Sequence, residues 1–398
     1  MKTSTGEYAL RCGTILSLEP GRPPIDDGLI VVRNGTIQAL DGYRRLKRSL
    51  DVPIQDIGDG PLVPGPINAH THLELSHLQG RTTLGRGFAA WVESLIQLPM
   101  HGIDGASLDK ALQALSSLST AAVGDISGHN PRYIVRALEA TDLDYMLFLE
   151  FLGFREPRSN GLTWPKSLHP EKNSRLSLSG HALYSTHPST LQLCKSWANK
   201  NRRPFVIHLA ESPSEVELLT TGRGALADLL KPLLLPDPYI PPGTSPIRYA
   251  DQLGLLDANT LAVHCVQIDD RDIDILQRRR VRVCLCPRSN GLINVGRAPW
   301  EKMRGAEVEL CLGTDSLCSN TDLDLWSEAE HLLQEAATSP SLAELMAMLC
   351  LNPARALGLE ERLGSLAPGK KASFALVPDR IIEACRGRST AGCSGHAG

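Results

Sequence analysis

The chain has 398 residues, of which 42% are hydrophobic and 21% charged, a globular composition that excludes a collagenous, coiled-coil or wholly disordered protein. Its 41 lysines and arginines against 44 aspartates and glutamates give a net charge of −3, which argues against nucleic acid or an anionic membrane as the main partner. The 10 cysteines are too few for a disulfide scaffold, and no apolar run suits a signal peptide or a membrane span. We therefore expect a soluble protein of the cytoplasm.

The chain opens with short apolar runs separated by turn residues, over residues 8–63. Asn34-Gly35 between two such runs is a strong signal for a β-hairpin. Near the other end, residues 373–377 form an apolar strand that we expect to return to this unit. The prediction is a small β-sandwich formed by both chain ends, residues 1–63 and 360–398. We expect its small, polar tail, residues 381–398, to be disordered.

From residue 64 onward, short apolar runs alternate with segments of helical period, such as residues 214–230. Eight of these runs suit buried strands: residues 67–72, 121–126, 145–151, 176–182, 204–209, 261–265, 281–286 and 307–313. Eight strands alternating with helices predict a (β/α)₈ TIM barrel, here over residues 64–359. Residues 231–246 hold six prolines and predict a loop inserted after a helix.

Four histidines and one aspartate stand at the ends of predicted strands. His70 and His72 end the first strand, and residues two apart on a strand face the same side. His208, His264 and Asp315 end the fifth, sixth and eighth strands, at the face where barrel active sites are built. Without a cation, these groups packed together would face desolvation costs of several kcal/mol. The pattern predicts a metal site, and buried structural histidines are the less favoured alternative.

The motifs around these residues resemble the metal-dependent amidohydrolase superfamily. His208-Leu209-Ala210-Glu211, Cys286-Pro287-Arg288-Ser289-Asn290 and Gly313-Thr314-Asp315-Ser316 are similar to its cytosine deaminase and chlorohydrolase-like branch. Residues 352–358 and 364–371 match the segments that lead that branch back to its β-sandwich. Ser373 departs from the pattern, since an aspartate is common there.

The resemblance implies the metal. Family members with two metals bridge them with a carboxylated lysine on a middle strand, but residues 144–151 and 176–182 contain no lysine. One divalent ion is therefore favoured, zinc with iron or manganese as alternatives. Its ligands would be His70, His72, His208 and Asp315, with water in the open position, and His264 would hydrogen-bond that water.

Glu211 is the predicted proton donor. It lies three residues after His208 and can reach a substrate above the metal, although a carboxylate at a helix start is the alternative. In the implied reaction Asp315 takes the proton of the water, Glu211 protonates a ring nitrogen, and His264 stabilises the developing oxyanion. The result is hydrolytic loss of an amino group from a heterocycle.

Further residues are candidates for substrate binding. His181 resembles the family's substrate-contacting histidine, and a satisfied core imidazole is its alternative. Arg155 and Arg158 follow the third strand, and Arg288 and Asn290 follow the seventh. Arginines at the barrel mouth suit a carboxylate, against the alternative of solvated loop charges.

The overall pattern, including the proline-rich insert, is similar to the aminodeoxyfutalosine deaminases of menaquinone biosynthesis, whose substrate is an adenine nucleoside with a carboxylate. The alternatives are a deaminase of adenosine or S-adenosylhomocysteine, of guanine or of cytosine, and a chlorohydrolase. A non-catalytic scaffold is a remote alternative, because every ligand is present. We expect a small heterocycle as the partner, and the sequence leaves homo-oligomer formation open.

Overall fold

The computed structural model describes residues 6–157 and 161–387, which fall into two compact units. The first unit comprises Met1–Ile67, Ser116–Ala121 and Leu325–Gly398. The second comprises Asn68–Leu115 and Ala122–Asp324. By contacts, residues 325–359 thus group with the chain ends. The domain boundaries expected at residues 63 and 359 stay predictions.

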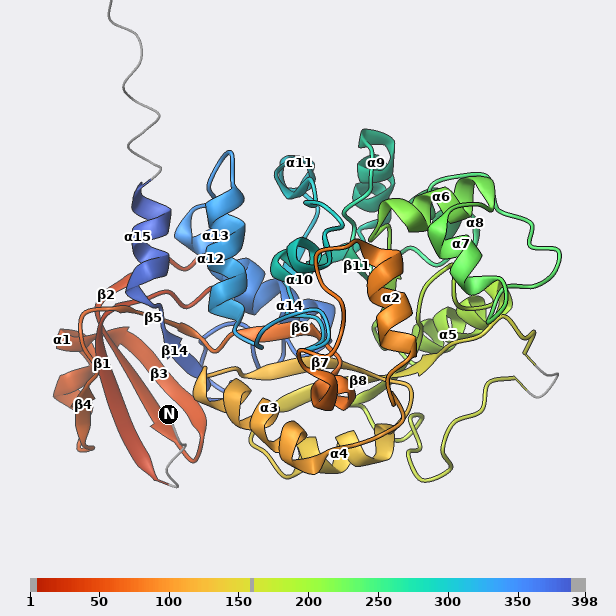
Figure 1. Cartoon of the computed structure of the whole chain (residues 1–398). Helices are drawn as coiled ribbons and strands as arrows, with labels where there is room; N and C mark the ends of the chain where they lie inside the picture. Colours follow the sequence, from red (N-terminus) through yellow and green to blue (C-terminus); the bar gives the residue numbers. More distant parts are fainter. Residues whose placement is uncertain (1–5, 158–160, 388–398) are drawn as a thin grey trace, which may run out of the picture. The chain divides into compact units, whose positions relative to one another are not determined.

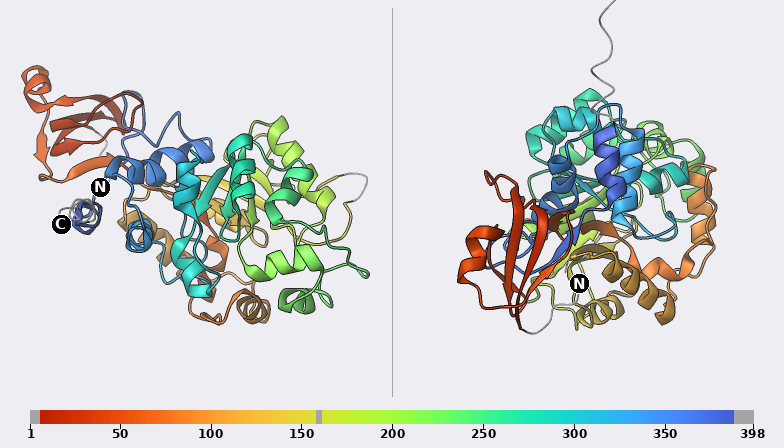
Figure 2. Two further views of the ribbon diagram at one scale, coloured as in Figure 1. Left: turned by 90° about the horizontal axis from the view of Figure 1, so that it is seen from above. Right: turned by 90° about the vertical axis from the view of Figure 1, so that its left-hand side faces the viewer.

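A six-stranded sheet forms the core of the first unit, in the order β14-β5-β1-β2-β3, with β4 paired to β1. The strands are β1 (Glu7–Ile15), β2 (Ile25–Arg33), β3 (Thr36–Gly42), β4 (Ile54–Asp56), β5 (Pro61–Pro64) and β14 (Phe374–Leu376). Asn34 and Gly35, both with positive φ, join β2 and β3 in the predicted hairpin. The predicted return of the chain is confirmed, because β14 pairs antiparallel with β5 (Figures 1 and 2).

Both faces of this sheet bury apolar side chains. One cluster includes Leu10 and Ile30, and the other includes Ala9 and Leu29, because neighbouring residues of a strand point to opposite faces. The described strands of the unit pair into one sheet, so the two-layer sandwich stays a prediction. The expected disorder of the tail is wrong for residues 381–387, which belong to the helix α15 (Asp379–Gly387) and include the buried Ile381. Residues 388–398 lie outside the described part of the chain.

Eight strands form the core of the second unit, one in each predicted segment. They are β6 (Ile67–Thr71), β7 (Ala122–Ser127), β8 (Asp144–Phe151), β9 (Leu176–Gly180), β10 (Phe205–Leu209), β11 (Thr260–His264), β12 (Arg282–Leu285) and β13 (Leu310–Leu312). They make two four-stranded sheets, β6-β7-β8-β9 and β10-β11-β12-β13. β7 to β9 and β10 to β13 pair in parallel, and most of their residues are buried, as in sheets covered on both faces.

Parallel bridges connect these two sheets at both junctions, between Ala182 and His208 and between Thr71 and Asp315. The His208 amide donates to the His181 carbonyl and the Asp315 amide to the His70 carbonyl, each at 3.0 Å. The carboxyl ends of β6, β10 and β13 are therefore held close together, although they are far apart in the sequence.

Helices connect the strands. Those of the second unit are η2 (Leu73–Leu78), α2 (Phe88–Ile96), α3 (Gly105–Ser117), α4 (Pro131–Glu139), α5 (Pro188–Lys200), α6 (Pro213–Thr221), α7 (Ala225–Leu230), α8 (Pro246–Gln252), α9 (Asp270–Arg279), α10 (Pro287–Ile293) and α11 (Trp300–Gly305). Those of the first unit, besides α15, are α1 (Tyr43–Leu46), η1 (Lys47–Ser49), α12 (Leu325–Glu335), α13 (Leu342–Met346), η3 (Ala347–Leu351) and α14 (Asn352–Ala356). α4 packs against β8, and α5 against β9 and β10 (Figure 1).

Two details correct or confirm the predicted helices. The helix expected over residues 214–230 is broken into α6 and α7, because Gly222 ends α6 in the left-handed conformation with φ 71°. The proline-rich loop is confirmed, since no helix or strand occurs between α7 and α8. Within the described residues, every helix is too short or too polar to cross a bilayer.

Candidate metal and catalytic site

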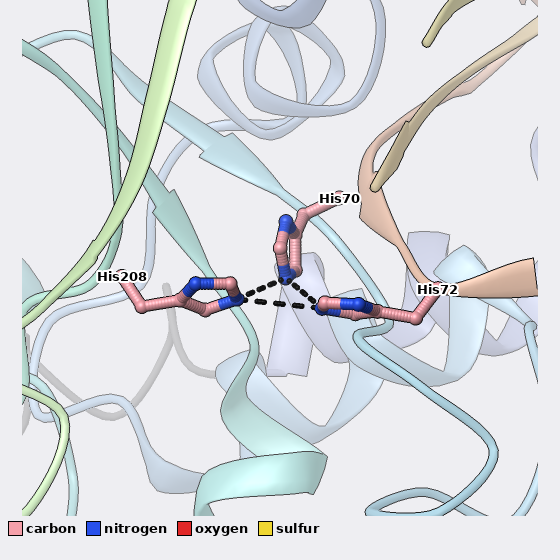
Figure 3. Close-up of side chains that lie close together, drawn as sticks. All are labelled: His70, His72 and His208. Carbon is pink, nitrogen blue, oxygen red and sulfur yellow. Dashed lines mark hydrogen bonds between the residues drawn. The ribbon is translucent and has the colours of Figure 1, made fainter. Parts of the chain in front are cut away.

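Three imidazoles converge at the carboxyl ends of β6 and β10 (Figure 3). The Nε2 atoms lie 3.1 Å apart for His70 and His72, 3.2 Å for His70 and His208, and 3.3 Å for His72 and His208. The structure thus brings together three of the predicted ligands. Each neutral Nε2 carries either one proton or one lone pair, so the three atoms cannot all satisfy one another by hydrogen bonds.

The protonation of these rings favours a cation at the centre. His208 donates from Nδ1 to the His181 carbonyl at 2.9 Å, which leaves the lone pair on Nε2 facing the other two rings. Burial and the neighbouring His70 lower the pKa of His72 to about 3, so its ring is neutral as well. Asp315 Oδ1 lies 3.6 Å from Nε2 of both His70 and His72. Three imidazole nitrogens and one carboxylate oxygen fit a divalent ion such as zinc.

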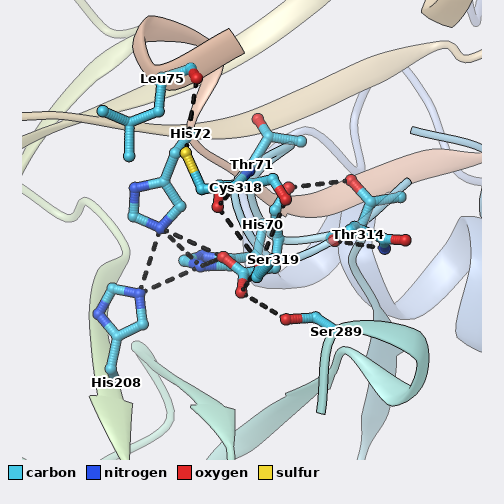
Figure 4. Close-up of polar contacts among 12 residues, drawn as sticks. His70, Thr71, His72, Leu75, His208, Ser289, Thr314, Cys318 and Ser319 are labelled. Carbon is cyan, nitrogen blue, oxygen red and sulfur yellow. Dashed lines mark hydrogen bonds and ion pairs between the residues drawn. The ribbon is translucent and has the colours of Figure 1, made fainter. Parts of the chain in front are cut away.

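Two serines orient Asp315. Ser289 and Ser319, both labelled in Figure 4, each donate a hydrogen bond to Asp315 Oδ2 at 2.7 Å. Oδ1 is therefore the oxygen that faces the histidines. Burial opposes ionisation of Asp315, but the contact with His70 and the nearby His264 and His72 outweigh it and hold its pKa well below the usual range. Neither serine was predicted as a site residue, although Ser289 lies within the motif of residues 286–290 and Ser319 lies three residues after Ser316.

The backbone is strained where these strands end. Ala210, His264 and Asp315 follow or end β10, β11 and β13 with φ values of 51°, 75° and 59°. A left-handed residue other than glycine costs roughly 1–2 kcal/mol. Left-handed residues occur elsewhere in the chain too, and these three lie where β10, β11 and β13 reach the site.

Glu211 lies beside His264, with 3.6 Å between Oε1 and Nε2. Both side chains are buried, and burial, followed by the charges of Asp315 and Glu215, raises the pKa of Glu211 well above its ordinary value. Polar atoms of Glu211, His264 and Asp315 lie within 4.8 Å of one another. The predicted catalytic residues are therefore close together, with the pKa of one carboxyl lowered and that of the other raised.

Neighbouring residues position this pair. Glu215, a carboxylate in the first turn of α6, accepts hydrogen bonds from the amides of Ala210 at 3.0 Å and Glu211 at 2.7 Å. Ser212 caps α6 by accepting from the Glu215 amide at 3.1 Å. Glu211 itself stands directly before this cap, so its catalytic role and its alternative as a carboxylate at the helix start both stay predictions. Sequence reasoning missed Glu215, although its place three residues after a capping serine is a known signature.

The candidate substrate residues lie in different surroundings. Asn290 is buried, and its Oδ1 lies 3.0 Å from His264 Nδ1, so it orients that ring. His181 places Nδ1 2.5 Å from Ser185 Oγ, and its ring centre is 4.7 Å from that of His208. Burial lowers the pKa of both His181 and His264 to about 4.

The three candidate arginines differ in their surroundings. Arg288 makes a two-pronged ion pair with Asp322, at 2.6 and 2.8 Å, so its charge is already matched. Arg155 is exposed in the loop that follows β8. Arg158 lies outside the described residues. Substrate contacts by these residues stay predictions.

Comparison with known proteins agrees with this geometry. The sequence profile of the amidohydrolase family matches residues 62–391. The chain belongs to the amidohydrolase family. It is a hydrolase that acts on carbon–nitrogen bonds, and the resemblance found in its sequence is confirmed.

Three similar proteins illustrate the relationship. A 5-methylthioadenosine/S-adenosylhomocysteine deaminase from Syntrophobacter fumaroxidans is 29% identical over 407 residues, covering 96% of this amidohydrolase and 86% of the relative. An aminodeoxyfutalosine deaminase from Deinococcus radiodurans is 29% identical over 323 residues, covering 77% and 76%. The crystal structure of Helicobacter pylori aminofutalosine deaminase with methylthio-coformycin is 21% identical, covers 92% and 91% of the two chains, and superposes with a TM-score of 0.79.

The two serines provide a test of the Asp315 geometry. The double variant Ser289→Ala/Ser319→Ala should bind zinc roughly 10–100-fold more weakly, because the carboxylate loses the bonds that aim Oδ1 at the histidines. Competition with a chromophoric chelator measures this affinity. Ser196→Ala, at an exposed position of α5, is the matched control. Equal affinity in the double variant and the control would contradict the role given to the serines.

Proposed function

We propose that this amidohydrolase is a metal-dependent deaminase of an adenine nucleoside, built on a closed (β/α)₈ barrel with a small β-sandwich formed by both chain ends. The two bridges between the four-stranded sheets support closure of the barrel. The observation that carries the function is the position of Glu211, whose pKa is raised, beside His264 and close to Asp315, whose pKa is lowered. A site with one carboxyl of raised pKa and one of lowered pKa can give one proton to a ring and take one from water.

His70, His72, His208 and Asp315 would hold one divalent ion, for which we propose zinc, with iron or manganese as alternatives. When bound there, a divalent cation supplies the Lewis acidity that makes water nucleophilic near neutral pH.

The residues of the chain supply the proton transfers. Asp315 is ionised and accepts the proton that the attacking water loses. Glu211 donates its proton to the ring nitrogen next to the amino-bearing carbon, so that negative charge does not build up on the ring. His264, held by Asn290, stabilises the oxygen that adds to the ring. The proton on Asp315 then leaves with the amino group, and the added hydroxyl returns its proton to Glu211 as the carbonyl forms, so that one water is consumed for each ammonia released.

The names of the relatives point to adenine nucleosides. Among these we propose aminodeoxyfutalosine, which places the enzyme in menaquinone biosynthesis, with 5-methylthioadenosine or S-adenosylhomocysteine as the alternatives. Since Arg288 is paired with Asp322, we assign Arg155 to the substrate carboxylate. A cytoplasmic location and a homo-oligomer stay predictions.

Ammonia release across a substrate panel tests the substrate class. The enzyme should release ammonia from the adenine nucleosides, which are aminodeoxyfutalosine, adenosine and 5-methylthioadenosine. It should release none from guanine or cytosine. Arg155→Ala should raise KM about tenfold for aminodeoxyfutalosine, because it loses one charged contact, and leave KM for 5-methylthioadenosine unchanged. Turnover of only guanine or cytosine would overturn the proposal, and an equal KM for aminodeoxyfutalosine would remove Arg155 from carboxylate binding.

Glu211 gives a pH-dependent test. Because its raised pKa keeps it protonated at neutral pH, kcat/KM of the wild-type enzyme should fall as rising pH removes that proton. Glu211→Gln should retain zinc, lose roughly 10²–10⁴-fold in kcat, and lack this alkaline decline. Glu139→Gln, at an exposed position of α4, is the control. A Glu211→Gln enzyme with the wild-type rate would show that another group protonates the ring.

A further inference from the structure

Glu150 is a half-buried acid to which the mechanism gives no task. It lies near the carboxyl end of β8, and its Oε1 atom is buried without a hydrogen-bond partner among the described residues. A buried polar atom without a partner costs roughly 1–3 kcal/mol, so such an atom usually has a ligand or a functional reason.

The nearby carboxylate of Glu74, on η2, does not supply a partner for this oxygen. Glu74 already accepts hydrogen bonds from Ser127 Oγ at 2.6 Å and from the Gly128 amide at 2.8 Å. A Cβ atom added at Gly128 would lie 3.4 Å from Glu150 Oε2, so this carboxyl is close to the exposed Gly128. Glu150 Oε1 therefore finds no partner in Glu74, whose carboxylate oxygens already accept hydrogen bonds.

The other neighbours of Glu150 are His181 and His208, since one ligand atom of each of the three residues lies within 4.8 Å of the other two. His208 uses Nδ1 for the His181 carbonyl and turns Nε2 to His70 and His72. His181 uses Nδ1 for Ser185, which leaves Nε2 as its available atom. Glu150 and His181 are therefore the pair that can meet a further group.

This pair fits a hydroxyl better than a second cation. One oxygen atom can lie about 2.8 Å from each of two atoms that are less than 4.8 Å apart, and a hydroxyl both donates and accepts. Catalytic and structural zinc sites take at least three protein ligands, but here only two side chains have atoms to spare.

The geometry points to Glu150 as a specificity residue that, together with His181, holds a ribose hydroxyl of the nucleoside. This assignment rests on the proposed function. Glu150 thus lies beside His208, one of the proposed metal ligands, whereas the reacting ring is assigned to Glu211, which follows β10. In a nucleoside, the sugar is the part that carries hydroxyl groups.

Kinetics with matched nucleosides test the assignment. The zinc-loaded wild type, Glu150→Leu and Glu150→Gln are compared on the ribonucleoside that the wild type deaminates best and on its 2′-deoxy and 3′-deoxy forms. The wild type should favour the ribonucleoside over one deoxy form by about tenfold in kcat/KM, as expected for one hydrogen bond. Glu150→Leu should lose that preference through a higher KM for the ribonucleoside, with kcat/KM for that deoxy form little changed. Glu150→Gln, which keeps a polar group of the same size, should retain part of the preference.

Each remaining outcome decides the matter. Glu139→Gln is the control and should match the wild type on all three substrates. If both Glu150 variants turn over normally and keep the wild-type ratio of kcat/KM for the ribonucleoside to that for the deoxy form, the role of Glu150 is overturned and the proposed function is not. An equal loss on ribo and deoxy substrates would also overturn it, because it would indicate a structural role. If the wild type deaminates no nucleoside, the proposed function fails and this assignment fails with it.

Discussion

The close approach of three imidazole Nε2 atoms is the constraint on which the rest of the site depends. Three nitrogens within 3.1–3.3 Å of one another cannot form a closed set of hydrogen bonds, and a cation is the partner that satisfies all three lone pairs. The backbone bonds of His208 to His181 and of Asp315 to His70 hold the strand ends in place, so the ligands arrive from opposite ends of the second unit's sequence. Part of the folding free energy is therefore used to keep polar groups together.

The environment of the centre gives its two carboxyl groups opposite states. Asp315 faces histidines and accepts two serine hydrogen bonds, whereas Glu211 is buried beside other carboxyl groups. Separate pKa values for neighbouring acids allow one to donate a proton while the other accepts one. Neither state depends on residue type alone, because each is set by the partners that the fold supplies.

Sequence reasoning reached the strands and the residues that converge at their carboxyl ends, because both have strong local signals. Buried parallel strands appear as continuous apolar runs, and His70, His72, His208, His264 and Asp315 stand at their ends. It could not identify hydrogen bonds between distant segments. The bond of Asn290 to His264 and the ion pair of Arg288 with Asp322 are examples, and the substrate contacts predicted for these two residues stay predictions. Ser289, Ser319 and Glu215 were missed for the same reason, since their partners are fixed only by folding.

The break at Gly222 and the helix after residue 378 were missed because helical periodicity does not show where a backbone turns or which tail residue is buried.

X-ray absorption spectroscopy of the purified, zinc-loaded enzyme tests the central claim most directly, because it counts the atoms bound to the ion. The account predicts one zinc per chain with three imidazole nitrogens at about 2.0–2.1 Å and oxygen in the remaining positions. Sulfur is the informative alternative to nitrogen and oxygen as a zinc ligand, because the chain has buried thiols at Cys265, Cys284 and Cys318. Sulfur at about 2.3 Å, fewer than three imidazoles, or no zinc in stoichiometric amount would contradict the account.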